Sequence, residues 1–223
     1  MATTRRRPLN RERILAAALE LVDEQGIDAL SMRKLGQALG YEAMSLYNHV
    51  ANKDDLLAGI LDLVLAEMEP PDPAGGLPSI RASALSAHEA LRRHPWAASM
   101  LMSPSGIRPA RIAYMEALLA SLRGTGLSAD MTYHAYHVLD AHIFGFSLWR
   151  ATYAYEAEQA GDLAASLDDF IPPDEYPNLN EHGRQHMTEG PHRDVDAFAL
   201  GLDLILEGLE TMRAGTGFEE ASH

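Results

Sequence analysis

Four polar side chains gather within residues 47–53, and their chemistry suits a phosphate backbone. Tyr47, Asn48 and His49 supply hydrogen-bond donors, and Lys53 adds a positive charge at the predicted start of a helix. The N-terminus of a helix also attracts anions through its exposed N–H groups. The group therefore predicts contact with nucleic-acid phosphates. A small helical bundle without a ligand is the alternative, but it gives no reason for this grouping.

The elements that must position this corner are predicted to be short helices. Asn10, Ser31 and Asn52 each precede apolar residues at helical spacing, so each is expected to cap a helix N-terminus. Gly40 ends the second helix and a very short third helix follows, which is the helix-turn-helix pattern that reads the DNA major groove. The predicted helices span about residues 10–26, 31–39, 42–47 and 52–69.

The stretch "PPDPAGGLP" at residues 70–78 marks a boundary between two parts of the chain. Helical patterns resume beyond it, and a polar, proline-broken connection interrupts them at residues 168–194. The predicted fold is all-α, with a three-helix helix-turn-helix domain at 1–53, a connecting helix at 54–69 and a larger helical domain at 70–223. The later helices are expected near 79–94, 95–102, 108–123, 128–159, 178–188 and 194–213.

Charge separates the same two parts. Residues 1–53 hold eight Arg/Lys and six Asp/Glu, a net of +2, whereas residues 54–223 hold ten Arg/Lys and 26 Asp/Glu, a net of −16. Because salt screens charges beyond about 8–10 Å, a local basic face can bind DNA although the whole chain carries −14. There is no cysteine, no signal-peptide pattern and no apolar run of membrane-spanning length, which predicts a cytoplasmic protein without disulfides or membrane contact.

The segment "ILAAALELVDEQGIDALSMRKLGQALGYEAMSLYNHVANKDDLL" closely resembles the DNA-binding domain of the TetR family of regulators. It combines a Glu-x-Gly-x-x-x-Leu-Ser-x-Arg run, a Leu-Gly turn, a Leu-Tyr-x-His motif and an Asn-Lys helix start, and the match covers about residues 10–60. More loosely, "HVLDAHIFGFSLWRA" and "DAFALGLDLILEGLE" resemble the C-terminal domain of tetracycline repressors. In that family the last long helices pair across a two-fold axis as a four-helix bundle.

The resemblance implies DNA contacts from the second helix, the third helix and the start of the fourth. Arg33 is expected in the groove or on a phosphate, Ser45 on a base or phosphate, and Lys53 on a phosphate. The predicted DNA-binding residues are Arg33, Ala43, Met44, Ser45, Tyr47, Asn48, His49 and Lys53.

Two features limit what the resemblance implies about DNA. Ala43, Met44 and Asn48 stand where tetracycline repressors carry glutamine, proline and tryptophan, so the operator sequence does not transfer. Residues 5–7 are three arginines, expected either to reach an adjacent groove or to be a solvated, disordered tail.

The acidic domain is expected to bind a small molecule and to form a homodimer. Methionine and aromatic side chains make adaptable apolar walls, although any single one of them is equally compatible with a plain core. The predicted ligand-binding residues are His88, Trp96, Met100, Met102, Ile112, Met115, His134, His137, Phe144 and Trp149. The predicted dimer face, which would pack with the helix near 130–159 against a second chain, is Phe198, Leu202, Ile205, Leu206 and Leu209.

Ten histidines leave a metal-responsive regulator open as an alternative. His134 and His137 lie one helical turn apart with Asp140 following, and His182 and His186 form a second pair near His192, so each pair needs a further ligand to hold zinc. An enzyme is disfavoured because the chain lacks a glycine-rich phosphate loop, a G-x-S-x-G elbow and a cysteine nucleophile. No cofactor is expected, and a module that binds no DNA is the remaining rival.

The sequence therefore predicts a homodimeric repressor that a small molecule releases from a palindromic double-stranded operator. Tetracycline repressors bind a metal–drug chelate through two histidines. Glu69 stands at the position of the first histidine in this chain. The second precedes a turn that reads "SPSGIRP" here, with Ile107 in place of threonine. We therefore expect the effector to be a mostly apolar, neutral or cationic molecule and not magnesium–tetracycline.

Overall fold

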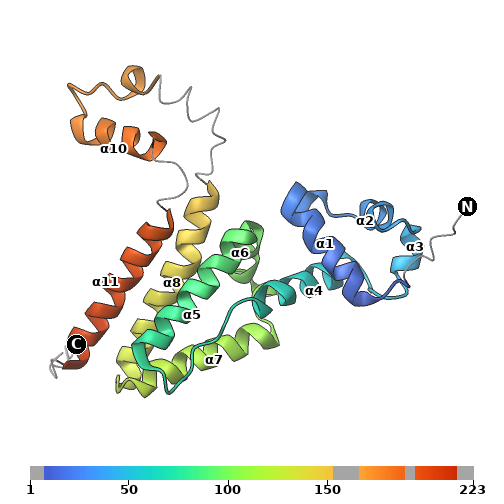
Figure 1. The fold of residues 1–223 in the computed structure, drawn as a ribbon, viewed down its shortest axis with the longest axis horizontal. Helices are drawn as coiled ribbons and strands as arrows, with labels where there is room; N and C mark the ends of the chain where they lie inside the picture. Colours follow the sequence, from blue (N-terminus) through green and yellow to red (C-terminus); the bar gives the residue numbers. More distant parts are fainter. Residues whose placement is uncertain (1–7, 153–165, 189–193, 215–223) are drawn as a thin grey trace, which may run out of the picture. The chain divides into compact units, whose positions relative to one another are not determined.

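The computed structural model describes residues 8–152, 166–188 and 194–214, and every regular element within these ranges is helical (Figure 1). The chain divides into two compact units, Met1–Leu148 and Trp149–His223. The predicted all-α class is confirmed, whereas the predicted borders at residues 53 and 69 stay a prediction. The elements are α1 Arg11–Gln25, η1 Ile27–Ala29, α2 Met32–Leu39, α3 Ala43–Leu46, α4 Lys53–Ala66, α5 Gly76–Arg93, α6 Pro95–Leu101, η2 Pro104–Gly106, α7 Pro109–Gly124, α8 Ala129–Thr152, α10 Pro177–Thr188 and α11 Asp194–Ala214.

Local caps explain where the first helices begin. The side chain of Asn10 accepts from Arg13 N at 2.9 Å, that of Ser31 from Lys34 N at 3.2 Å, and that of Asn52 from Asp55 N at 2.8 Å. Each bond satisfies a backbone donor that the first turn of a helix leaves unpaired. All three predicted caps are confirmed, and they fix the starts of α1, α2 and α4.

The head, defined as α1 to α3 with the first half of α4, is built around one apolar core. Helix α1 packs against both α2 and α4, and α2 packs against α3. The aliphatic side chains at the centre are almost fully shielded from water, and this burial is the main force that holds four short helices together. They include Ile14, Ala18, Leu30, Leu35, Leu46, Leu56 and Ile60.

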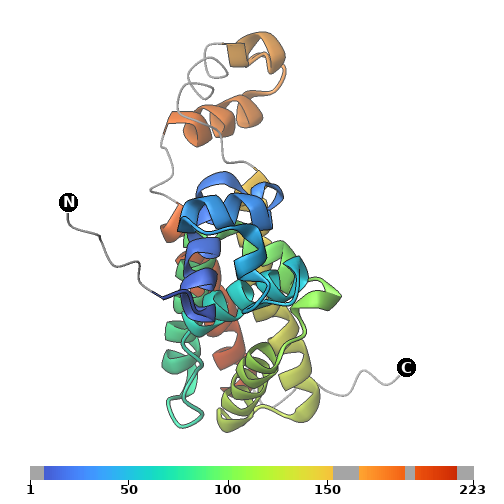
Figure 2. The ribbon, with the colours of Figure 1, turned by 90° about the vertical axis from the view of Figure 1, so that its right-hand side faces the viewer.

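Helix α4 continues from the head into a second group of helices in the same unit, α5 to α8 (Figure 1, Figure 2). It contacts α5, α6 and α7, and α5 packs most extensively against α7. On α4, Leu56 and Ile60, which belong to the core of the head, are followed by Leu61 and Val64, and Met68 lies just beyond the helix; all are buried. One helix therefore contributes buried side chains to the head and packs against α5, α6 and α7.

The second unit contains α10, α11 and the residues before α10. The side chain of Asn180 is buried and donates to Asp168 at 2.8 Å and to the carbonyl of Ile171 at 2.7 Å, while Arg184 forms an ion pair with Asp168. These bonds tie α10 to the short helical segment at residues 166–170 and to Ile171 directly after it. The predicted helices at 178–188 and 194–213 are confirmed to within one residue, and residues 153–159 of the predicted long helix lie outside the described residues.

Candidate functional site

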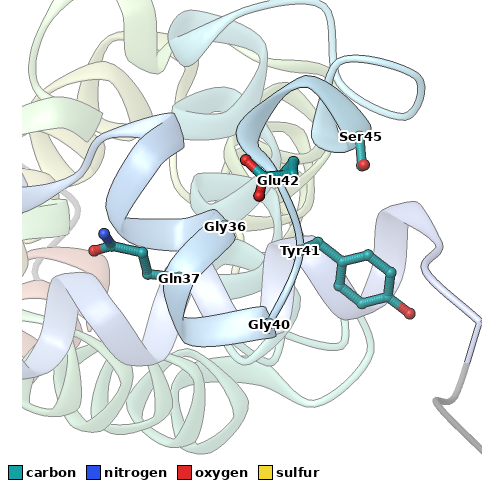
Figure 3. Close-up of a pocket in the computed structure, with 6 residues that line it drawn as sticks. All are labelled: Gly36, Gln37, Gly40, Tyr41, Glu42 and Ser45. Atoms are coloured by element: carbon teal, nitrogen blue, oxygen red, sulfur yellow. The ribbon is translucent and has the colours of Figure 1, made fainter.

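The turn between α2 and α3 depends on two glycines. Gly40 adopts the left-handed conformation with φ of 73°, and its N–H donates to the carbonyl of Gln37, which ends α2. A Cβ atom on Gly36 would lie 2.8 Å from the carbonyl oxygen of Tyr41, so only glycine allows α3 to approach α2 this closely. The approach leaves an open hollow of about 310 Å³, lined by Gly36, Gln37, Gly40, Tyr41, Glu42 and Ser45 (Figure 3).

None of the predicted DNA-binding side chains is buried. Leu46 is fully buried and anchors α3, which turns its neighbours outward. Met44 is 74% exposed and Tyr47 is 46% exposed. Arg33, Asn48 and Lys53 are also exposed, and Ala43, Ser45 and His49 are half-buried. The geometry leaves all eight accessible to a ligand, and their contact with DNA stays a prediction.

An ion pair that the sequence analysis missed holds the corner between α3 and α4. The guanidinium of Arg11 donates to both carboxylate oxygens of Asp55, at 2.7 and 2.9 Å, and to the carbonyl of His49 at 3.2 Å. Asp55 also accepts from Ala51 N at 2.9 Å. These bonds lower the pKa of Asp55 from 3.8 to about 2, and the bond from Arg11 has the largest effect. The segment carrying Tyr47, His49 and Lys53 is thereby fixed to α1.

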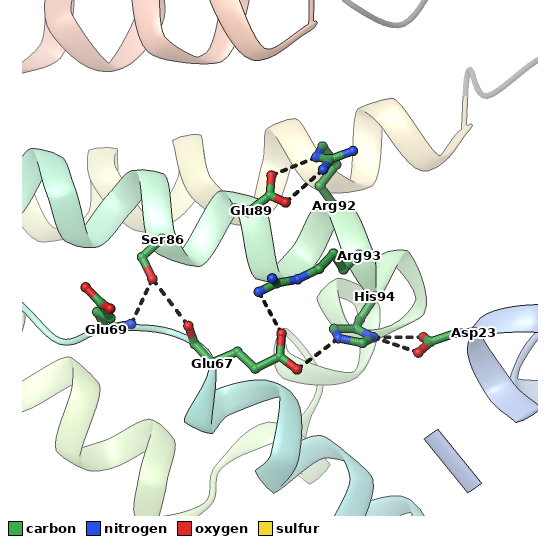
Figure 4. Close-up of polar contacts among 8 residues, drawn as sticks. All are labelled: Asp23, Glu67, Glu69, Ser86, Glu89, Arg92, Arg93 and His94. Atoms are coloured by element: carbon green, nitrogen blue, oxygen red, sulfur yellow. Dashed lines mark hydrogen bonds and ion pairs between the residues drawn. The ribbon is translucent and has the colours of Figure 1, made fainter. Parts of the chain in front are cut away.

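A polar joint connects the head to the start of α6 (Figure 4). We define the joint as Asp23 of α1, Glu67 at the end of α4, and Arg93, His94 and Trp96 of the α5–α6 corner. The buried ring of His94 places Nδ1 at 2.8 and 2.9 Å from the two oxygens of Asp23 and Nε2 at 3.3 Å from Glu67. Arg93 pairs with Glu67 at 2.7 Å.

Trp96 belongs to this joint, which corrects its predicted place in a ligand pocket. Its indole N–H donates to Asp23 at 2.8 Å, and its ring packs against the apolar core of the head. The sequence analysis assigned Trp96 to the effector site because aromatic residues line such sites. In the structure the same side chain bridges α1 and α6, so a shift of α6 acts directly on the head.

Two serines of α5 hold the residues that follow α4, and Figure 4 shows one of them, Ser86. Ser83 donates to the carbonyl of Glu69 at 2.7 Å. Ser86 accepts from the N–H of Glu69 at 3.0 Å and donates to the carbonyl of Glu67 at 3.3 Å. On the other side of α4, Asp62 pairs with Arg108 at the start of α7. The connecting helix is thus hydrogen-bonded to α5 and α7 as well as to the head.

A second polar group, the Arg111 cluster, lies between α5, α7 and α8. It comprises Ser83, Arg111, Tyr114, Tyr136, Asp140 and Phe144. Arg111 is only 6% exposed and pairs with Asp140, while its guanidinium carbon lies 4.2 Å from the centroid of the Phe144 ring. Burial raises the pKa of Tyr136 to about 12 and also raises that of Tyr114, so both phenols remain protonated at neutral pH.

The remaining predicted ligand-binding residues differ in how far they are exposed. Phe144 and His88 are buried, and the His88 ring meets Phe146 edge-on at 5.5 Å between centroids. Met100 and Met115 are half-buried. Five of the predicted residues are exposed, and their contact with a ligand stays a prediction: Met102, Ile112, His134, His137 and Trp149.

The histidine pairs form no metal site among the described residues. His137 Nδ1 lies 2.8 Å from the carbonyl of Tyr133 on its own helix, and its ring packs against the Tyr133 ring at 4.3 Å between centroids. Asp140, the predicted third ligand, pairs with Arg111 instead. His192 lies outside the described residues.

The predicted dimer face turns inward within the chain. Phe198, Leu202, Leu206 and Leu209 are buried, and Ile205 is half-buried. Exposed apolar side chains of α11 include Leu200 at 63%, Leu204 at 62% and Met212 at 46%. The apolar pattern therefore marks a helix face that is buried within the described residues, and its role in pairing with a second copy stays a prediction.

Comparison with known proteins gives consistent matches along the chain. The model of "Bacterial regulatory proteins, tetR family" matches residues 14–60, and that of "Tetracyclin repressor-like, C-terminal domain" matches residues 70–213. The HTH-type transcriptional repressor DrrR1 of Streptomyces coeruleorubidus is 30% identical over 96% of this chain and 82% of its own length. The class D tetracycline repressor protein of Escherichia coli is 34% identical over 91% of this chain and 89% of its own length.

Solved structures extend the likeness to the whole fold. Streptomyces coelicolor ActR in complex with actinorhodin superposes with a TM-score of 0.74 at 29% identity, over 94% of this chain and 99% of that one. ActR without a ligand gives 0.67 at 30% identity, over 95% of this chain and 100% of that one.

Proposed function

Because this chain belongs to the TetR family of bacterial helix-turn-helix transcriptional regulators, we propose that it is a homodimeric repressor which leaves its operator when a small molecule binds among α5 to α8. Members of the family regulate transcription and are not enzymes. The family also favours a small-molecule effector over the metal-responsive alternative. A role on operator DNA supports a cytoplasmic location. None of the helices within residues 8–152, 166–188 and 194–214 has the length and hydropathy of a membrane span.

The observation that carries the proposal is the joint between the head and α6. A repressor that responds to a ligand needs a mechanical connection between the ligand site and the DNA-reading helix. Here His94 and Trp96 bond the α5–α6 corner to Asp23 on α1, and Glu67 brings the end of α4 to the same point. Movement of α6 therefore reaches the head through two buried or half-buried side chains instead of a flexible linker.

One relative supports the ligand half of the proposal. Streptomyces coelicolor ActR, 29% identical to this chain, is solved in complex with actinorhodin, so this architecture holds an organic molecule. For this chain we propose a mostly apolar, neutral or cationic effector. We propose that the effector is not magnesium–tetracycline, because Glu69 stands where tetracycline repressors carry a chelate-binding histidine and no histidine precedes the "SPSGIRP" turn. Micromolar binding of the chelate in titration calorimetry would contradict that exclusion.

We propose that dimerisation uses the exposed stripe of α11 instead of the buried one. Leu200 and Leu204 lie one helical turn apart and are both largely in water, whereas apolar side chains of this size stabilise an interface when covered. Two heads held about 34–36 Å apart would then meet successive major grooves of a palindrome. Leu200→Arg with Leu204→Arg should yield monomers in sedimentation. A folded double variant that remains dimeric would exclude this face.

Selection of bound DNA from a random pool tests the function directly. The full-length protein should enrich a palindromic site, and a gel shift with that site should be lost in Arg33→Ala. Arg92→Ala is the matched control, because it removes an exposed positive charge on α5, far from the reading helix, where Arg92 pairs only locally with Glu89 at 2.7 Å. Failure to enrich any sequence would refute the proposal and favour the module that binds no DNA.

A further inference from the structure

The Arg111 cluster contains a buried hydrogen-bond donor that lacks an acceptor. The Nη2 group of Arg111 donates to Asp140, but Nη1 is buried without a hydrogen-bond partner among the described residues. The side chain is 7% exposed, so bulk water reaches it poorly. An arginine that is withdrawn from water is normally fully bonded, because burial of an unsatisfied donor is unfavourable. The free Nη1 is therefore a donor that an acceptor from outside the chain would satisfy.

The charges around Nη1 favour a neutral acceptor. Asp140 already balances the guanidinium, and it also accepts from the hydroxyl of Tyr136 at 3.3 Å. A second carboxylate beside Nη1 would have to lie close to the Asp140 carboxylate in a medium of low dielectric constant, where like charges repel strongly. A carbonyl oxygen accepts the same N–H without adding charge. The ring of Phe144, stacked on the guanidinium, supplies an apolar surface next to it.

The cluster is also linked to the end of α4. Ser83 has a single hydroxyl hydrogen, which it donates to the carbonyl of Glu69, so the 2.9 Å bond between Ser83 and Tyr114 must run from the tyrosine hydroxyl to the serine oxygen. Tyr114 in turn lies beneath the guanidinium of Arg111, 5.9 Å from its ring centroid. A ligand on Nη1 would thus be connected, through the side chains of Tyr114 and Ser83, to the hydrogen bond that Ser83 donates to the carbonyl of Glu69.

We propose that Arg111 Nη1 anchors the effector by donating to a neutral carbonyl oxygen, and that Tyr114 and Ser83 pass the change to α4. This inference rests on the proposed function, since it names the polar group of the effector and the residue that receives it. It narrows the predicted effectors to neutral carbonyl compounds, and it excludes both anions and oxygen-free hydrocarbons.

Three ring-matched probes test the anchor in the full-length protein: 9-fluorenone, fluorene and fluorene-9-carboxylate. Calorimetry should show 9-fluorenone binding about tenfold more tightly than either of the others, which is the discrimination expected when a buried donor finds its acceptor. The infrared carbonyl band of bound 9-fluorenone should move to lower frequency. Equal affinity of 9-fluorenone and fluorene, tighter binding of the carboxylate, an unshifted band or no binding at all would overturn the proposal.

Variants separate the anchor from general folding. The double variant Arg111→Met with Asp140→Leu removes both partners of the ion pair. It should bind 9-fluorenone no more tightly than fluorene, and it should still bind the operator. Tyr114→Phe should still bind 9-fluorenone but release the operator less completely. If the double variant fails to fold, the probe comparison and the infrared band in the wild type still decide. Absence of operator binding in the wild type would instead refute the proposed function and leave the probe result to be judged separately.

Discussion

The head and the Arg111 cluster differ in how their cationic side chains are exposed to water. In the head, Arg33 and Lys53 lie exposed in water, where a cation costs little and remains available to a phosphate. In the cluster, Arg111 is taken out of water and balanced by Asp140 on another helix. The first arrangement suits a partner that the protein binds and leaves, and the second suits a neutral acceptor for a buried donor. Ser83 connects the cluster to the end of α4, because it bonds both Tyr114 and the carbonyl of Glu69.

The largest expected effect comes from breaking the buried pair. Arg111→Ala leaves the carboxylate of Asp140 without its partner, and we expect a loss of about 3 kcal/mol in the free energy of unfolding, because an uncompensated buried charge is strongly unfavourable. Urea denaturation measures it. Arg33→Ala serves as the control in the head and should change stability by less than about 0.5 kcal/mol. If Arg111→Ala and Arg33→Ala lost the same free energy of unfolding, the buried and the exposed arginine would not differ in their contribution to stability.

Cutting the joint should give an intermediate effect. His94→Ala leaves Asp23 and Glu67 facing each other without the ring between them, so we expect about 1–2 kcal/mol of lost stability and a weaker response of operator binding to the effector. Trp96→Phe keeps the packing against the head but removes the bond to Asp23, and should reproduce the weaker response with a smaller loss of stability. A full effector response in both variants would show that the signal travels by another route.

The smallest effect concerns the bridge between Arg11 and Asp55. Asp55→Asn should cost about 1 kcal/mol at neutral pH, as expected for a partly exposed pair. Because the folded-state pKa is about 2 and the ordinary value is 3.8, the stabilisation is complete above the ordinary value and disappears as the pH falls through 2. The difference between wild type and variant, measured by urea denaturation at about pH 7, 4 and 2, should therefore shrink between the last two values. A constant difference would mean that the carboxylate is not the stabilising form.

Local signals in the sequence predicted the head well. The caps at Asn10, Ser31 and Asn52 and the turn at Gly40 depend on residues three or four positions away, so short-range patterns suffice. The joint and the Arg111 cluster depend on pairs far apart in the chain: 71 residues separate His94 from Asp23, and 29 separate Arg111 from Asp140. No periodicity in a single sequence encodes such pairings.

The α11 stripe illustrates a different limit. Spacing alone identified Phe198, Leu202 and Leu206 as one apolar face, and the structure buries that face. An apolar stripe is equally satisfied by its own chain or by a second copy, so the sequence had no means of choosing between them. The exposed pair Leu200 and Leu204 became a candidate only when burial was known.

The central claim is that exposed cations of the head hold operator phosphates, and the salt dependence of binding tests it most directly. For the selected operator, the slope of log K against log salt should flatten in Lys53→Ala by about 1 for each half-site, because each phosphate contact releases about 0.9 counterion. Arg92→Ala, with the same change in charge, should leave the slope unchanged. A folded Lys53→Ala protein with the wild-type slope would contradict the account.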